Sequence, residues 1–188
     1  MSTLKVSTIS PLGTDATKTI TLGESAGTLA IASGAKTSGF GKIGQVVSTT
    51  KTDSFSSTST SFTDVTGLSV SITPTSTSSK ILVLVNTNAS SVNATYSGVM
   101  RLVRDSTAIG IGTNSSATYI GFNALRRNNG SDESKSINYN FVDSPSSVSE
   151  QTYKVQIDVQ GDTFYVNRTG TNNEFSGAST ITAMEILD

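Results

Sequence analysis

The residue types that most often carry chemistry in proteins are missing from this sequence. Its 188 residues include neither histidine nor cysteine. This excludes imidazole bases, thiolate nucleophiles, metal sites with histidine or cysteine ligands, and disulfides. A serine nucleophile would then need a lysine or a carboxylate as its base. No segment resembles G-x-S-x-G or S-x-x-K in a usable context. The sequence therefore points away from an enzyme, and we predict no catalytic residue.

Carboxylates are the remaining candidates, because glycosidases use a pair of them across a cleft. Asp158 and Glu185 fall within apolar segments typical of strands, and their alternation with apolar neighbours predicts that both simply face solvent. Asp132 and Glu133 lie in a polar stretch typical of a solvated loop, and no D-x-D-x-D-G calcium loop occurs. Gly110-Ile-Gly112 lacks the lysine and the following helix of a phosphate-binding loop. We therefore predict no metal and no cofactor.

A few side chains could instead contact a ligand or a neighbouring protein. Arg126 and Arg127 form the only local basic cluster, which is either a solvated loop tip or a contact for an acidic sugar or another protein. Tyr96, Tyr119 and Tyr139 could stack on a sugar ring, although their spacing also fits the core or a subunit contact. The predicted contact residues are Arg126, Arg127, Tyr96 and Tyr119.

The composition describes a neutral, hydroxyl-rich surface. Only 14% of the residues are charged, against about a quarter in ordinary proteins, and serine and threonine supply about a third of the chain. The net charge of −1 gives no field to attract nucleic acid or an anionic membrane. No apolar run reaches the roughly 20 residues that span a bilayer, and Met1–Ser10 lacks signal-peptide features. We expect synthesis in a cytoplasm, no nucleic-acid partner and no membrane insertion.

Alternating apolar residues predict an all-β domain over residues 43–188. Strand signals recur about every ten residues, with the clearest alternation from Tyr153 to Val159, and no window shows a helical period. Ile81 to Val85 is an unbroken apolar run, which predicts a central strand covered on both faces. About ten strands favour a jelly-roll-like antiparallel β-sandwich. The predicted loops are 51–60, 74–79, 126–135 and 143–149.

Residues 1–42 differ from the rest of the chain in their pattern of short apolar runs, which predicts an extended N-terminal arm. Two short apolar runs, at 19–22 and 28–32, alternate with threonine and alanine, and neither can bury its apolar side alone. The arm therefore needs other chains or a surface as partners, the alternative being a disordered tail of Ser/Gly-rich composition. The residues predicted to anchor it are Leu4, Val6, Ile9, Ile20, Leu22, Leu29 and Ile31.

The same argument favours a homotrimer. If one face of the strand at Ile81–Val85 fills the sandwich core, the other can meet symmetry mates around a threefold axis. Cyclic closure then satisfies every copy of the patch. A strand covered by loops of its own chain would explain the run equally well.

Several segments resemble tail-fibre-like structural proteins of marine phages. Met1-Ser-Thr-Leu-Lys-Val-Ser-Thr-Ile9 and Thr19-Ile-Thr-Leu-Gly23 are similar to the N-terminal arm of that group. Segments similar to its C-terminal domains are Gly44–Val47, Ser59–Val65, Ser71–Val83, Arg101–Arg104 and Thr107–Gly112. The resemblance covers most of the chain up to about residue 125. It implies a homotrimeric virion protein with an attachment arm and a distal β-sandwich, and it carries over no catalytic residues.

The sequence therefore gives three hypotheses. The first is a trimeric fibre or decoration subunit of a phage virion, assembled in the host cytoplasm. Residues 1–42 would anchor it to capsid or tail proteins, and it could contact a host surface glycan; the short chain favours a head fibre, a decoration or a tail appendage over a complete long fibre. The second is a carbohydrate-binding receptor-recognition module, and the third is a glycan-degrading spike enzyme.

Overall fold

A computed structural model describes residues 42–91, 97–113, 120–126, 134–161, 163–169 and 175–187. The described residues form strands and no helix, so none forms a helix that could cross a membrane. The all-β prediction is therefore confirmed. The strands are β1 (Ile43–Lys51), β2 (Phe55–Ser57), β3 (Thr63–Ile72), β4 (Lys80–Ser91), β5 (Ser97–Arg104), β6 (Thr107–Ile109), β7 (Asn123–Arg126), β8 (Lys135–Asp143), β9 (Gln151–Val159), β10 (Phe164–Val166) and β11 (Ser179–Ile186).

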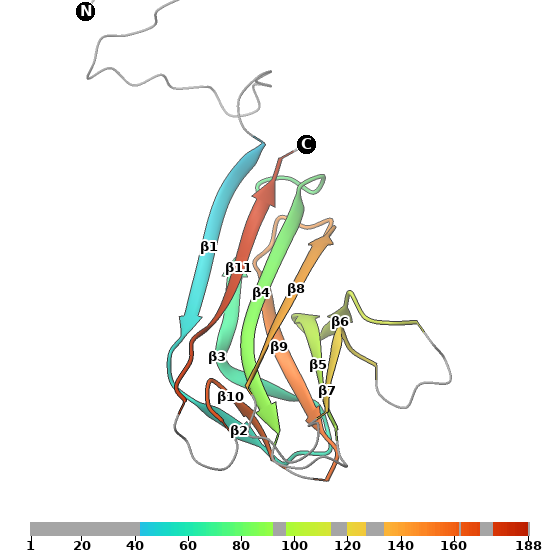
Figure 1. Ribbon diagram of the computed structural model, residues 1–188. Coiled ribbons are helices and arrows are strands. Elements are labelled where there is room, and N and C mark those ends of the chain that lie inside the picture. The colour runs from blue at the N-terminus through green and yellow to red at the C-terminus, as the bar shows by residue number, and fades with distance from the viewer. Residues whose placement is uncertain are drawn as a thin grey trace, which may run out of the picture. The chain divides into compact units, whose positions relative to one another are not determined.

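The strands form two antiparallel sheets, which we call sheet A and sheet B (Figure 1). In sheet A, β4 pairs with β11 and β10 along one edge and with β8 along the other, while β1 pairs with β11 and β2 with β10. In sheet B, β9 lies between β3 and β5, and β6 and β7 share the far edge of β5. Both sheets are therefore built around a long central pair of strands.

Three pairs of strands, β1 with β2, β10 with β11 and β6 with β7, each form one interrupted strand. β1 and β2 follow one another along β11 and β10, and β6 and β7 follow one another along β5. Counted this way, sheet A has the order β1/β2, β11/β10, β4, β8, and sheet B the order β3, β9, β5, β6/β7. Two four-stranded sheets with these crossovers form a jelly roll, as the sequence predicted.

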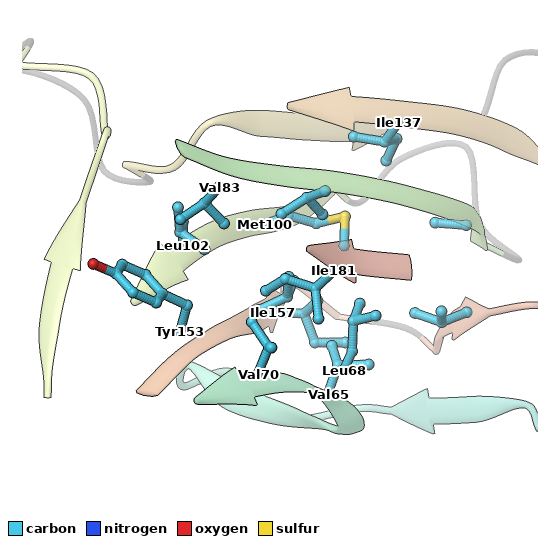
Figure 2. Close-up of a cluster of buried hydrophobic side chains, with 14 of the residues drawn as sticks. Val65, Leu68, Val70, Val83, Met100, Leu102, Ile137, Tyr153, Ile157 and Ile181 are labelled. Carbon is cyan, nitrogen blue, oxygen red and sulfur yellow. The ribbon is translucent and has the colours of Figure 1, made fainter. Parts of the chain in front are cut away.

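The core lies between the inner faces of the two sheets. Leu68 and Val70 of β3 belong to the same buried cluster as Val83 of β4 and Ile181 of β11 (Figure 2). A Cβ added at Gly98 of β5 would lie 2.0 Å from Cδ2 of Phe164, so this position admits only glycine. The apolar residues that alternate along the strands in the sequence are thus the ones that face the core.

The predicted boundaries need two corrections. The loop predicted at 51–60 contains β2, because Phe55 packs against the core and its short strand pairs with β10. The alternation of Ile109 and Ile111 in the sequence also predicts a strand at these residues. In the structure β6 spans Thr107–Ile109 and ends there, because Gly110 has a φ of 58° and leaves the extended conformation. A side chain at Gly110 would also collide with Tyr139 and Phe141.

Candidate functional site

The structure gives little information on the contact residues predicted from the sequence. Arg126 belongs to β7 and pairs with Ser97, but its side chain is not among those described. Arg127, Tyr96 and Tyr119 lie outside the described residues, as do all seven predicted anchoring residues of the arm. Their roles remain predictions.

Tyr139, the third tyrosine considered for sugar stacking, is a packing residue. Its ring stacks on Phe122 with centroids 4.5 Å apart and on Phe141 with centroids 6.4 Å apart. Its hydroxyl donates a hydrogen bond to the carbonyl oxygen of Gly110, and burial raises the pKa of this hydroxyl. Because Phe122 occupies one face of the ring, Tyr139 offers less of a platform than an exposed aromatic residue would.

The prediction that Glu185 faces solvent is wrong. Glu185 shares the inner face of β11 with Ile181 and Ala183, and its side chain is fully buried. Its Oε1 accepts hydrogen bonds from the amide and the hydroxyl of Thr75, at 2.6 and 2.7 Å, and its Oε2 accepts one from Gln45 at 2.9 Å. Burial pushes the pKa of Glu185 up, but these hydrogen bonds outweigh it and lower the pKa. Glu185 therefore fastens the loop before β4 to the end of the sandwich.

The other buried carboxylates also have structural partners. Asp143 of β8 accepts 2.7 Å hydrogen bonds from Arg104 of β5 and from the hydroxyl of Tyr153 of β9, which joins the two sheets. Burial and the Asp143 carboxylate raise the pKa of Tyr153. Asp158 was also predicted to face solvent, but it is only 7% exposed and accepts a hydrogen bond from Gln160. It alternates with the core residues of β9, so it lies on the outer side of sheet B, away from Glu185.

The carboxylates that the sequence singled out do not come together in the described residues. Asp158 and Glu185 lie on different sides of sheets A and B and do not form a glycosidase pair. Within the described ranges, no group of three or more acidic side chains is placed to hold a metal ion.

An apolar row crosses four strands on the outer face of sheet A. The pairing register places Val46 of β1 beside Met184 of β11, Met184 beside Leu82 of β4, and Leu82 beside Val142 of β8. Val46 is 53% exposed and Val142 is 50% exposed, while Met184 and Leu82 are half-buried. A continuous apolar row of this kind normally marks a contact surface.

Two further rows complete this surface. Next to the apolar row lie Ser48, Thr182, Leu84 and Asn140; beyond them lie Thr50, Thr180, Asn86 and Asn138. We call these three rows, together with Ile186, the neutral face, because none of their residues is charged. Lys80, at the first residue of β4, borders the face beside Ile186. A depletion of charge at an apolar patch is typical of protein interfaces.

The outer face of sheet B has the opposite character. Arg101 lies 3.7 Å from the centroid of the Phe62 ring and donates two hydrogen bonds to Gln156. Asp64 in turn accepts hydrogen bonds from Gln156 at 2.6 Å and from Lys154 at 2.8 Å. This network satisfies its own charges and hydrogen bonds. The neutral face is therefore the better candidate for contact with a partner.

Sequence reasoning found only part of the neutral face. The apolar run at Ile81–Val85 singles out Leu82 and Leu84. The sequence predicts a strand covered on both faces, but within the single chain these two outward side chains are only half-buried. Val46, Val142 and Met184 each stand next to another apolar residue of their own strand, and nothing local in the sequence sets them apart. The available signal was the absence of charge at the outward positions of the four strands beyond Lys80, and only the register brings those positions together.

No model of a known protein family matches the chain, and no curated protein matches it.

Proposed function

We propose that this chain is a non-enzymatic structural protein of a phage virion, a homotrimeric fibre or decoration subunit. The observation that carries the proposal is the neutral face of sheet A, with its row of Val46, Met184, Leu82 and Val142. Burying apolar surface contributes about 25 cal/mol per Å². Association of copies through this face would therefore stabilise the assembly without any ligand or cofactor.

The phage assignment is supported by the sequence resemblance described above. In this proposal residues 1–42 anchor the protein to a capsid or tail protein, and the sandwich faces outward from the particle. The mechanism is attachment: main-chain pairing and apolar contacts hold the arm, and the outer loops meet the host surface.

The first test is the native mass of the full chain and of a variant lacking residues 1–42. A trimeric mass for both supports the proposal and assigns the threefold contact to the β-sandwich. A monomeric full chain at high protein concentration would contradict it. The virion assignment is tested by proteomic analysis of purified particles from the phage that encodes the chain, and absence of the chain would overturn it.

A second candidate is a carbohydrate-binding receptor-recognition module. It is supported by the half-buried rings of Phe122, Tyr139 and Phe141 at one edge of the sandwich. Binding to purified host envelope glycans distinguishes this function from simple decoration. Loss of that binding in Phe122→Ala, with the fold intact, would assign it to these rings.

A further inference from the structure

A small pocket lies at one end of sheet A. The starts of β1 and β4 and the end of β11 meet at this end (Figure 1). The pocket has a volume of about 100 Å³ and is lined by Lys42, Ser78, Lys80, Ile186 and Leu187; we call it the lysine pocket. Pockets that enclose a whole small-molecule ligand usually measure about 300 Å³ or more. The lysine pocket therefore has room for a single functional group of a larger partner.

Strand pairing brings the two lysines to this pocket. Lys80, the first residue of β4, is paired with Ile186 of β11, and the amide of Leu187 donates a 2.6 Å hydrogen bond to the carbonyl oxygen of Lys42. The two lysines therefore lie on the two sides of the end of β11, and both are exposed. Two positive charges at one site repel each other, and a bound anion would relieve this repulsion.

Neither lysine has a carboxylate partner among the described residues. The ion pairs in this part of the chain belong to other cations, namely Lys51, Arg104 and Lys154. Glu185 stands next to Ile186 in the sequence, but its carboxylate points into the sandwich and accepts hydrogen bonds from Thr75 and Gln45. The described part of the chain thus leaves the positive charge of the pocket unbalanced.

Ser78 adds a hydrogen-bond donor to the pocket. Its backbone amide donates to Oγ of Ser76 at 3.2 Å, and the two serine hydroxyls lie 2.9 Å apart. When the Ser76 hydroxyl donates to Ser78, the proton of the Ser78 hydroxyl is left for a ligand. Two ammonium groups and a hydroxyl suit a carboxylate, which only accepts hydrogen bonds. Ile186 and Leu187 supply apolar surface for the carbon atoms that carry it.

We propose that the lysine pocket binds an acidic side chain, from glutamate or aspartate, of the virion protein to which this chain is attached. The inference rests on the proposed function and adds a second contact to it, on the sandwich itself. Lys42 is the last residue of the predicted arm, so a protein that holds the arm lies within reach of the pocket. An acidic sugar fits less well, because the pocket is too small to enclose a sugar ring.

The contact is tested on purified particles with a carbodiimide. This reagent joins a lysine amine to a carboxylate in direct contact with it, forming an amide bond with loss of water. Mass spectrometry of the digested particles then identifies the joined residues. We expect Lys42 or Lys80 to be joined to an acidic residue of another virion protein. Lys135, an exposed lysine at the opposite end of sheet A, is the internal control and should not be joined to that residue.

Substitutions measure the contribution of the two charges. The probe is a capped tetraglutamate peptide, and the readout is the backbone NMR signals of Ile186 and Leu187 in the full chain. Lys42→Gln combined with Lys80→Gln changes only exposed side chains, so the fold tolerates it, and circular dichroism verifies this. We expect this variant to bind the peptide about tenfold more weakly, because two ion pairs are lost. Lys135→Gln, the matched control, should bind it as the parent chain does.

The outcomes separate this inference from the proposed function. Cross-links of Lys42 and Lys80 confined to carboxylates of this chain, in the same or another copy, overturn the inference. Tighter binding of glucuronate or inorganic phosphate than of the peptide also overturns it, as does equal peptide binding by all variants. Particles that contain the chain but show no cross-link from either lysine overturn the inference and leave the proposed function standing. Absence of the chain from the particles overturns both.

Discussion

The outer faces of sheets A and B carry different sets of polar side chains. Both carry a cross-strand hydroxyl pair at 2.8 Å between an edge strand and its neighbour: Ser48 with Thr182 in sheet A, and Ser71 with Thr152 in sheet B. Around the pair in sheet B, Arg101, Asp64 and Lys154 form a polar network, as a solvent-exposed sheet requires. Around the pair in sheet A the neighbours are apolar, hydroxyl or amide side chains, and none of them is charged.

The few charged residues of this chain are therefore distributed unevenly between the two outer faces. On the outer side of sheet B, the charged side chains of Asp64 and Lys154 pair with one another, and Gln156 donates a further hydrogen bond to Asp64. In β1, β4, β8 and β11, charged side chains are absent from the three rows of the neutral face. At the far end of sheet A, beyond these rows, Arg168 lies over the ring of Tyr165, so the absence of charge is a property of the neutral face and not of the whole sheet.

The largest expected effect comes from placing one charge at the matched hydroxyl pairs. Thr182→Lys puts an ammonium group at the centre of the neutral face, where copies of the chain would bring these groups together. We expect the assembly to dissociate to folded monomers by native mass spectrometry. Thr152→Lys, the matched control on sheet B, should leave the mass unchanged. Equal behaviour of the two variants would remove the distinction between the faces.

The next largest effect concerns the buried acid inside sheet A. Glu185→Ala removes the acceptor of the amide and the hydroxyl of Thr75 and one of the two acceptors of the Gln45 side chain. We expect the free energy of unfolding to fall by about 3 kcal/mol. Chemical denaturation measures it. Asp64→Ala, on the exposed network of sheet B, should cost less than about 1 kcal/mol. A cost at Glu185 no larger than that at Asp64 would contradict the structural role of Glu185.

A smaller effect is expected on lowering the pH. Hydrogen bonds lower the folded-state pKa of Glu185, as interactions with Lys154 and Gln156 do for Asp64. A lowered folded-state pKa gives stability that is present above the unfolded-state pKa, about 4, and is lost as the pH falls through the folded-state value. Stability should therefore drop below about pH 4, and Glu185→Gln should flatten that drop more than Asp64→Asn. The neutral face has no acid, so acid should not weaken the contact itself while the fold persists.

The smallest effect is that of salt. Raising the ionic strength screens the exposed ion pair of Asp64 with Lys154, and we expect a loss of stability below about 0.5 kcal/mol. The same salt should leave the assembly through the neutral face intact, because apolar contacts are not screened. Native mass measured by light scattering at low and high salt checks this. Dissociation in salt would indicate a contact based on charge.

Much of this protein follows from its sequence alone. The period of two in β3, β9 and β11 marks strands because successive side chains point to opposite faces, and short strands separated by turns favour a sandwich. The run at Ile81–Val85 indicates the central strand of sheet A. The absence of histidine and cysteine excludes whole classes of chemistry before any fold is known.

Only the tertiary structure decided which neighbours those side chains have. Alternation predicts two faces for β11 but does not say which is buried, so Glu185 was assigned to solvent when it lies inside with Thr75 as its partner. Val46, Met184, Leu82 and Val142 are far apart in the sequence, and the strand order with its pairing register makes them one row. Local sequence fixes the direction of a side chain relative to its own strand; contacts between distant strands depend on the packing of the whole sandwich.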